Sequence, residues 1–266
     1  MKTLNPTQRA CLEAMGIDVW VSRENSNEEL NTEKAEYAKD EQASEVISVA
    51  QPALAEVESL TSEVENKPAT ESSAQLDVPQ NWQGLKATVS NCTRCSLHSS
   101  RIQTVFGSGN EKADWLIIGD KPSEADNTSG EPFSDKAGEL LTAMLRSIGL
   151  TRQQVYVANT LKCITPNNRE PEASESEACL QYLKQQINLI QPKLILVVGQ
   201  SAAQRLLGTH STMARLRQKV HSLESINIPV VVTYHPSYLL SMPADKGKAW
   251  QDLLFANKVI STEAVL

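Results

Sequence analysis

Four short apolar runs stand out in the chain, over residues 114–120, 153–161, 192–200 and 228–236. They lack the polar alternation of a half-exposed strand, so each predicts a strand that is buried on both faces, as in a parallel sheet. Between and after them, apolar residues recur at helical spacing over 137–150, 177–190, 201–208 and 247–260. This alternation predicts a three-layer α/β/α domain with a central, mainly parallel four-stranded sheet.

Polar motifs follow three of the predicted strands. Gly-Asp-Lys-Pro stands at 119–122, Asn-Thr-Leu-Lys-Cys at 159–163 and His-Pro-Ser at 235–237. In an open α/β sheet the ligand crevice lies beyond the carboxyl ends of the strands. We therefore expect these three motifs to converge on one site.

The charge of the chain is unevenly distributed. The formal net charge is −7, but residues 24–71 alone contain thirteen acidic residues and three lysines. Such a segment buries too little apolar surface to offset its chain entropy, so we expect 24–77 to be a disordered acidic linker. The rest of the chain is then slightly basic, and the acidic total does not exclude nucleic-acid binding. The predicted organisation is a short N-terminal peptide (1–23), this linker, and a folded domain (78–266).

The N-terminal peptide has apolar character but is too short to form a core. Asn5 is a candidate N-cap, with Pro6 at the first helical position and Gly16 as the helix stop. An apolar peptide tethered by a long linker suggests docking on a partner. The alternative is a helix that packs back on its own domain.

Four of the five cysteines have the spacing of a metal site, with Cys92 and Cys95 as a C-x2-C pair and Cys163 and Cys179 downstream. Four thiolates suit either zinc or an iron–sulfur cluster. The alternative is that they are buried structural cysteines, as we expect for Cys11. We expect a cytoplasmic protein, because the cysteines have a metal-type spacing and the N-terminus lacks the apolar core of a secretory signal. The sequence also has no run of apolar residues long enough to span a membrane.

Several motifs together resemble family 4 of the uracil-DNA glycosylase superfamily, its iron–sulfur type. They cover about residues 85–257, with C-x2-C followed by a G-x-G turn, GDKPSEADNTSGEPFSDKAGELL, NTLKCITPNNREP, LILVVGQSAAQRLLG and YHPSYLL. The resemblance implies the fold predicted above and hydrolysis of the N-glycosidic bond of deoxyuridine in DNA. It also implies a 4Fe–4S cluster on Cys92, Cys95, Cys163 and Cys179.

The resemblance also implies roles for individual residues. Asp120 would position water and stabilise the cationic sugar, and His235 would donate to uracil O2. Asn159 would hydrogen-bond to the uracil edge, and Phe133 would stack on the flipped base. Plainer alternatives are a capping role for Asp120, core roles for Phe133 and His235, and a backbone-bridging role for Asn159. Candidate phosphate contacts, some of which a solvated helix face would also explain, are Lys162, Arg169, Arg215, Arg217 and Lys219.

The departures from the family pattern cluster in the predicted pocket. Asp120 replaces a glutamate and is one methylene shorter. Lys121 replaces a small residue, so its cation would either fill the pocket or reach a phosphate, and we count it with Phe133 and Asn159 as a candidate substrate-binding residue. Ser123 and Asp135 replace glycines, and Thr165 replaces a proline. A pocket with these changes is what we expect of a family member whose glycosylase activity is weakened or lost.

A second resemblance concerns residues 12–23, which are similar to the N-terminal peptide of the psi subunit of bacterial DNA polymerase III. The matching positions are Leu12, Met15, Gly16, Ile17, Trp20 and Arg23. This likeness implies binding to clamp-loader subunits, with Leu12, Met15, Ile17 and Trp20 as contacts. The alternative function is therefore a non-catalytic clamp-loader accessory with a degenerate glycosylase domain.

Overall fold

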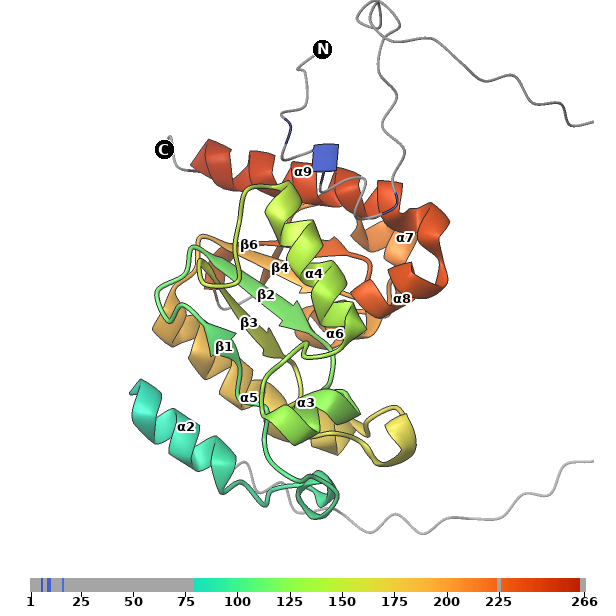
Figure 1. Ribbon diagram of the computed structural model, residues 1–266. Helices are drawn as coiled ribbons and strands as arrows, with labels where there is room; N and C mark the ends of the chain where they lie inside the picture. The colour runs from blue at the N-terminus through green and yellow to red at the C-terminus, as the bar shows by residue number, and fades with distance from the viewer. Residues whose placement is uncertain (1–5, 7–8, 11–15, 17–78, 224–225, 264–266) are drawn as a thin grey trace, which may run out of the picture. The chain divides into compact units, whose positions relative to one another are not determined.

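The computed structural model describes residues 79–223 and 226–263, together with Pro6, Arg9, Ala10 and Gly16 (Figure 1). Pro6, Arg9 and Ala10 are helical, and Gly16 has a φ of 69°, the conformation of a helix stop. The acidic linker and the predicted partner contacts Leu12, Met15, Ile17 and Trp20 lie outside the described residues.

The sheet contains the four predicted strands, which run parallel to one another. They are β2 (Trp115–Gly119), β3 (Val155–Asn159), β4 (Leu194–Val198) and β6 (Ile226–Thr233). Two short strands, β1 (Ser108–Gly109) and β5 (His221–Leu223), add antiparallel edges and bring the sheet to six strands in the order β1-β3-β2-β4-β6-β5. The two edge strands are too short to produce an apolar run, so the sequence did not predict them.

The four predicted helices are present with shifted ends. They are α4 (Lys136–Ser147), α5 (Ala173–Ile190), α6 (Gln200–Leu207) and α9 (Lys246–Glu263). Shorter helices are α2 (Trp82–Ser90), α3 (Glu124–Ser129), α7 (Met213–Leu216) and α8 (Pro236–Ser241), with 3-10 turns η2 (Ser96–Ser99), η3 (Pro166–Asn168) and η4 (Pro243–Asp245). Within the described ranges, every helix falls short of the length or the apolar character needed to cross a bilayer.

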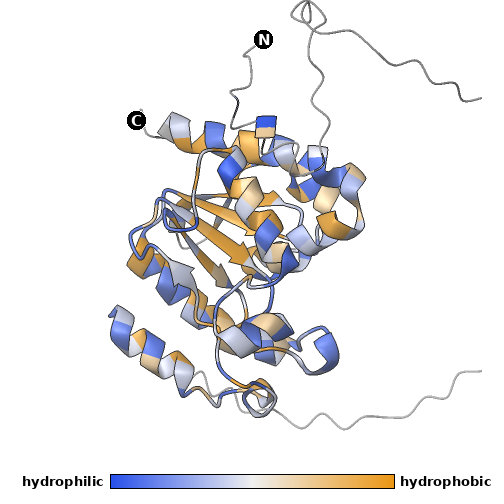
Figure 2. Ribbon diagram, viewed as in Figure 1, coloured by the Kyte–Doolittle hydropathy of each residue, from blue (hydrophilic) through white to orange (hydrophobic). Residues whose placement is uncertain are grey.

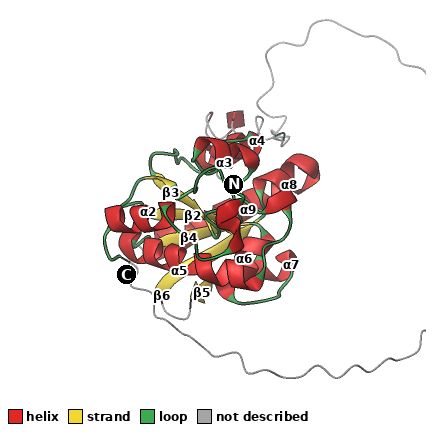
Figure 3. Ribbon diagram, turned by 90° about the horizontal axis from the view of Figure 1, so that it is seen from below, coloured by secondary structure: helices red, strands yellow, loops and turns green. Residues whose placement is uncertain are grey.

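Helices cover both faces of the sheet, which confirms the three-layer prediction (Figures 1 and 3). Alternate strand residues serve opposite faces: Ile117 packs toward α4 and α9, whereas Ile118 packs toward α5 and α6. The four parallel strands are accordingly largely apolar (Figure 2), although Asn159 and Thr233 are also buried in them. Helix α2 packs on α5 through a smaller cluster that contains Leu85 and Tyr182.

The strand order creates a crevice at the carboxyl edge of the sheet. After β2 the chain passes to β3 on one side, whereas β4 and then β6 lie on the other side of β2. Neighbouring strands β2 and β4 thus send their following segments in opposite directions. Ligands of open α/β sheets bind at such a switch point, so the fold itself places a site there.

Candidate active site

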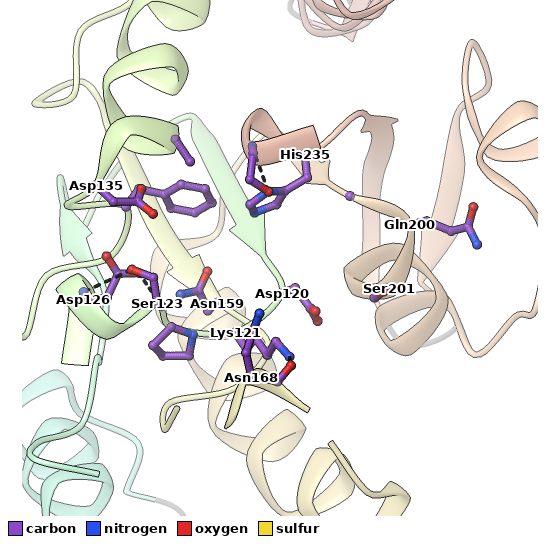
Figure 4. A pocket seen from close by; sticks show the side chains of 15 residues that line it. Asp120, Lys121, Ser123, Asp126, Asp135, Asn159, Asn168, Gln200, Ser201 and His235 are labelled. Carbon is purple, nitrogen blue, oxygen red and sulfur yellow. Dashed lines mark hydrogen bonds between the residues drawn. The ribbon is translucent and has the colours of Figure 1, made fainter. Parts of the chain in front are cut away.

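A pocket of about 360 Å³ opens at this carboxyl edge (Figure 4). The five predicted catalytic and substrate-binding residues all line it, namely Asp120, Lys121, Phe133, Asn159 and His235. Asp120 and Lys121 follow β2, Asn159 ends β3, and His235 lies just after β6. The convergence that the sequence predicted is therefore present.

Asn159 is buried in the pocket without a hydrogen-bond partner for its side chain. Its exposure is 1%, and neither Oδ1 nor Nδ2 has a partner within the part of the chain that the structure describes. Leaving a buried polar group unpaired costs about 1–3 kcal/mol, so native structures seldom keep one without a reason. An amide that carries one donor and one acceptor into a pocket is suited to a ligand with the complementary pair.

Gly119 gives Asn159 and Phe133 the space they occupy. It pairs with Asn159 across β2 and β3. A Cβ built on Gly119 would clash with Oδ1 of Asn159 and lie 2.7 Å from Cζ of Phe133. The absence of a side chain at this strand end is therefore a requirement of the pocket.

Phe133 and His235 form an aromatic wall. Their rings are stacked, with centroids 5.5 Å apart and planes inclined by 29°. Phe133 has a φ of 56°, a conformation that non-glycine residues adopt rarely and that often marks a functional site. Arg152 supports this turn, since its Nη2 donates to the carbonyls of Pro132 (3.0 Å) and Phe133 (3.2 Å).

His235 caps helix α8, and this contact defines its tautomer. Its Nδ1 accepts from the backbone N–H of Ser237 at 3.2 Å, and the Ser237 hydroxyl lies 2.6 Å away. An Nδ1 that accepts leaves the proton on Nε2. Burial lowers the pKa of His235 to about 4, against weaker opposing effects of Asp135 and Asp126. At neutral pH the ring is therefore a neutral donor through Nε2–H.

This pKa predicts a specific loss of stability in acid. Because the folded-state pKa lies below the value of 6.5 for a free imidazole, the unfolded chain binds the proton more readily between about pH 6.5 and pH 4. The free energy of unfolding therefore contains a contribution from keeping His235 neutral. This contribution is complete above pH 6.5 and is lost as the pH falls from 6.5 toward 4. We expect the free energy of unfolding of wild type to fall by up to about 2 kcal/mol more than that of His235→Gln. Denaturant titrations of both proteins at pH 7 and pH 4.5 measure this difference, and equal losses would contradict it.

Asp120 is paired with a residue that the sequence did not single out. Its carboxylate forms an ion pair with Arg205 of α6, and Nη2 of Arg205 also contacts Oε2 of Glu170 at 2.8 Å. The side chains of Asp120 and Arg205 are 17% and 16% exposed. The helical pattern of 201–208 predicted only an amphipathic helix, and no sequence signal indicated that its arginine reaches the β2 loop.

The residues that depart from the family pattern have structural uses. Ser123 caps α3 in a capping box with Asp126, and Asp135 caps α4 by accepting from the N–H of Gly138. The ammonium group of Lys121 donates to the carbonyls of Asn168 (2.8 Å) and Arg169 (2.7 Å). In Figure 4 Lys121 accordingly lies beside Asn168, so its cation is held by the loop that borders the pocket.

The prediction of phosphate contacts is wrong for Lys162. This side chain is buried, and its ammonium donates to Gln186 (2.6 Å) and to the carbonyls of Asn159 (2.9 Å) and Phe106 (3.2 Å). Burial lowers its pKa to about 7.

Two of the predicted arginines are engaged within the protein. Arg169 forms a two-pronged ion pair with the buried Glu175, and Nε of Arg217 donates to the buried Asp252 at 2.7 Å. Arg215 and Lys219 are exposed and stay candidates.

The four predicted cluster ligands gather in one region. Cys163 and Cys179 are buried with Leu97 and Leu161, and Cys95 packs against the same group. Arg101 links the C-x2-C segment to this group, because it donates to Sγ of Cys163 (3.1 Å) and to the carbonyl of Cys92 (2.8 Å). Burial raises the pKa of Cys179 to about 12.

The chemistry of four free thiols in one neighbourhood fits an iron–sulfur cluster. The arrangement is not that of a complete ligand shell, because among the described residues no three His, Cys, Asp or Glu side chains are placed to hold a metal ion.

An amide, a neutral imidazole and an aromatic face around one crevice are typical of proteins that bind a planar heterocyclic base. The comparisons with known proteins define this class further. The model of the uracil DNA glycosylase superfamily matches residues 106–254. The chain belongs to the uracil-DNA glycosylase superfamily.

Curated relatives within this superfamily are type-4 uracil-DNA glycosylases. The chain is 40% identical to that of Archaeoglobus fulgidus over 161 residues, which cover 58% of this chain and 81% of the relative. It is 35% identical to that of Pyrobaculum aerophilum over 180 residues (64% and 90%) and 38% identical to that of Thermotoga maritima over 154 residues (57% and 79%). These alignments agree with the family that the motifs indicated.

Proposed function

We propose that this chain hydrolyses the N-glycosidic bond of deoxyuridine in DNA and thereby starts base-excision repair. The observation that carries the proposal is the buried, unpartnered amide of Asn159 beside the stacked rings of Phe133 and His235. Uracil presents an acceptor, O4, next to a donor, N3–H. One asparagine amide complements this pair with its Nδ2 and Oδ1. The type-4 relatives support the same reaction.

The pocket residues divide the chemistry as follows. The target nucleotide leaves the DNA stack and enters the pocket, where Phe133 contacts the ring face and Asn159 binds the edge. As the bond breaks, negative charge develops on uracil O2, and Nε2–H of His235 donates to it. Asp120 stabilises the positive sugar and orients the attacking water. Its ion pair with Arg205 keeps the shorter carboxylate in a defined position.

A strand-cleavage assay tests this proposal. The purified chain is incubated with single-stranded DNA that contains one uracil, and abasic sites are then cleaved with alkali. We expect cleavage by wild type and its loss in Asp120→Asn and His235→Ala. If folded wild type produces no abasic sites in single- or double-stranded DNA, the proposal is wrong.

We further propose that Cys92, Cys95, Cys163 and Cys179 hold a 4Fe–4S cluster. Such a cluster supplies a rigid cross-link between the C-x2-C segment and the residues around 163–179 when bound. The existing contacts of Arg101 to both segments, and of Ser96 to Glu175 (2.6 Å), support a shared centre.

Anaerobic purification of full-length protein should give a brown sample with about four iron and four sulfide per chain. Cys163→Ser should lose most of the visible absorbance and iron, because it removes a ligand, whereas Cys11→Ser should keep both. A colourless wild type with zinc or no metal would contradict the cluster.

The clamp-loader alternative depends on residues 12–23, of which the structure describes Gly16 alone. Binding through Leu12, Met15, Ile17 and Trp20 stays a prediction from the sequence.

A further inference from the structure

Lys121 and the Asp120–Arg205 ion pair both connect to one short segment, residues 168–170. Lys121 reaches it directly through the carbonyls of Asn168 and Arg169. Asp120 reaches it through Arg205, whose second nitrogen contacts Glu170 at 2.8 Å. Two adjacent residues after β2 are therefore linked to the same segment, Lys121 directly and Asp120 through Arg205.

The turn that leads into this segment has a left-handed backbone. Asn167 and Asn168 have φ values of 50° and 55°, a left-handed conformation that costs free energy in non-glycine residues. Within the turn, the N–H of Asn168 donates to the carbonyl of Thr165 (3.2 Å) and the N–H of Arg169 donates to the carbonyl of Pro166 (3.1 Å). The hydroxyl of Thr165 also donates to the carbonyl of Arg169. Asn168 and Lys121 are both part of the pocket lining. The segment thus forms a wall of the pocket whose position depends on its contacts.

We propose that Lys121 and Arg205 are positioning residues that hold segment 168–170 against the pocket. We call the contacts of Lys121 and Arg205 with this segment the clasp. Lys121 fixes the backbone of the wall, and Arg205 fixes both its end at Glu170 and the carboxylate of Asp120. The clasp also joins the pocket to helix α5, because Arg169 is held by Glu175, in the first turn of the helix that carries Cys179. The wall is then preformed before DNA arrives, which lowers the ordering cost of binding.

Hydrogen exchange of the full-length chain tests the clasp without reference to activity. We expect the amides of Asn168 and Arg169 to exchange about tenfold faster in Lys121→Met, because Lys121 bonds the backbone of these residues. Arg205→Met should speed their exchange by about threefold, because Arg205 reaches the segment through the exposed side chain of Glu170. Lys121→Arg keeps donors within reach of the carbonyls and should restore most of the protection. Lys258→Met, an exposed lysine on α9, is the matched control and should exchange like wild type. The amides of β4 should stay protected in every variant, which separates local loosening from unfolding.

The kinetic readout rests on the proposed function. For uracil-containing DNA we expect Lys121→Met to raise KM about tenfold with a smaller effect on kcat, whereas Arg205→Met should lower kcat as well, because it also releases Asp120. Unchanged exchange at 168–170 in both variants would overturn the clasp even if wild type removes uracil. If wild type is inactive, the proposed function fails, and the exchange data alone decide on the clasp.

Discussion

Replacing Asn159 by leucine should lower kcat/KM for uracil excision by about a thousandfold and leave the folded protein at least as stable as wild type. Sites built to hydrogen-bond a ligand lose about 4 kcal/mol or more of transition-state binding when the matching groups are missing. The free protein, in contrast, contains an amide whose two polar atoms are buried without partners. Removing that amide removes an unpaired group, so we expect the free energy of unfolding to stay equal or to rise by about 1–3 kcal/mol.

Asn127 provides a matched control for this variant. It is also buried, but its Oδ1 accepts from the backbone N–H of Ile102 at 2.9 Å. Asn127→Leu should therefore destabilise the protein by about 1–3 kcal/mol. Steady-state kinetics and denaturant unfolding of both variants give the comparison. If Asn159→Leu proves as destabilised as Asn127→Leu while it keeps its activity, Asn159 has a structural role and the pocket assignment is wrong.

Replacing Gly119 by alanine should lower kcat/KM about a hundredfold. The added Cβ would clash with Oδ1 of Asn159 and lie 2.7 Å from Cζ of Phe133, so the edge-binding amide and the stacking ring must both move. A displacement near 1 Å in a catalytic site can cost this much in rate. The change is one methyl group, and it alters neither the charge nor the hydrogen-bonding groups of the pocket.

Gly247→Ala is the control for the added methyl. A Cβ at Gly247 meets no atom within 4 Å, so this variant should keep full activity and unchanged or slightly higher stability. A crystal structure of Gly119→Ala should show Asn159 or Phe133 shifted from the wild-type position. Full activity in Gly119→Ala would mean that the close approach of these three residues does not matter for the reaction.

The sequence predicted the central features of the fold because buried strands and amphipathic helices leave strong patterns. The runs at 114–120 and 192–200 became β2 and β4, and the polar motifs at the strand ends converge on the pocket. The two edge strands left no such pattern. Strand β1 has only two residues, one of them Gly109, and β5 begins at a half-buried histidine.

The polar contacts were predicted less well, because they depend on which segments meet in space. Lys162 looked like a phosphate contact, yet it is buried against Gln186 and backbone carbonyls. Arg205 looked like an ordinary helix residue, yet it pairs with Asp120 across a loop. The caps formed by Ser123 and Asp135 follow from local rules, but their importance emerged only once the helices α3 and α4 were placed beside the pocket.

Direct detection of the released base tests the central claim most simply. An oligonucleotide with a single deoxyuridine is incubated with wild type and with folded Asn159→Leu, and free uracil is quantified by mass spectrometry. We predict uracil from wild type at a rate about a thousandfold above that of the variant, with no thymine or cytosine released from the same strand. Equal uracil release by the two proteins, or none by wild type, would contradict the account.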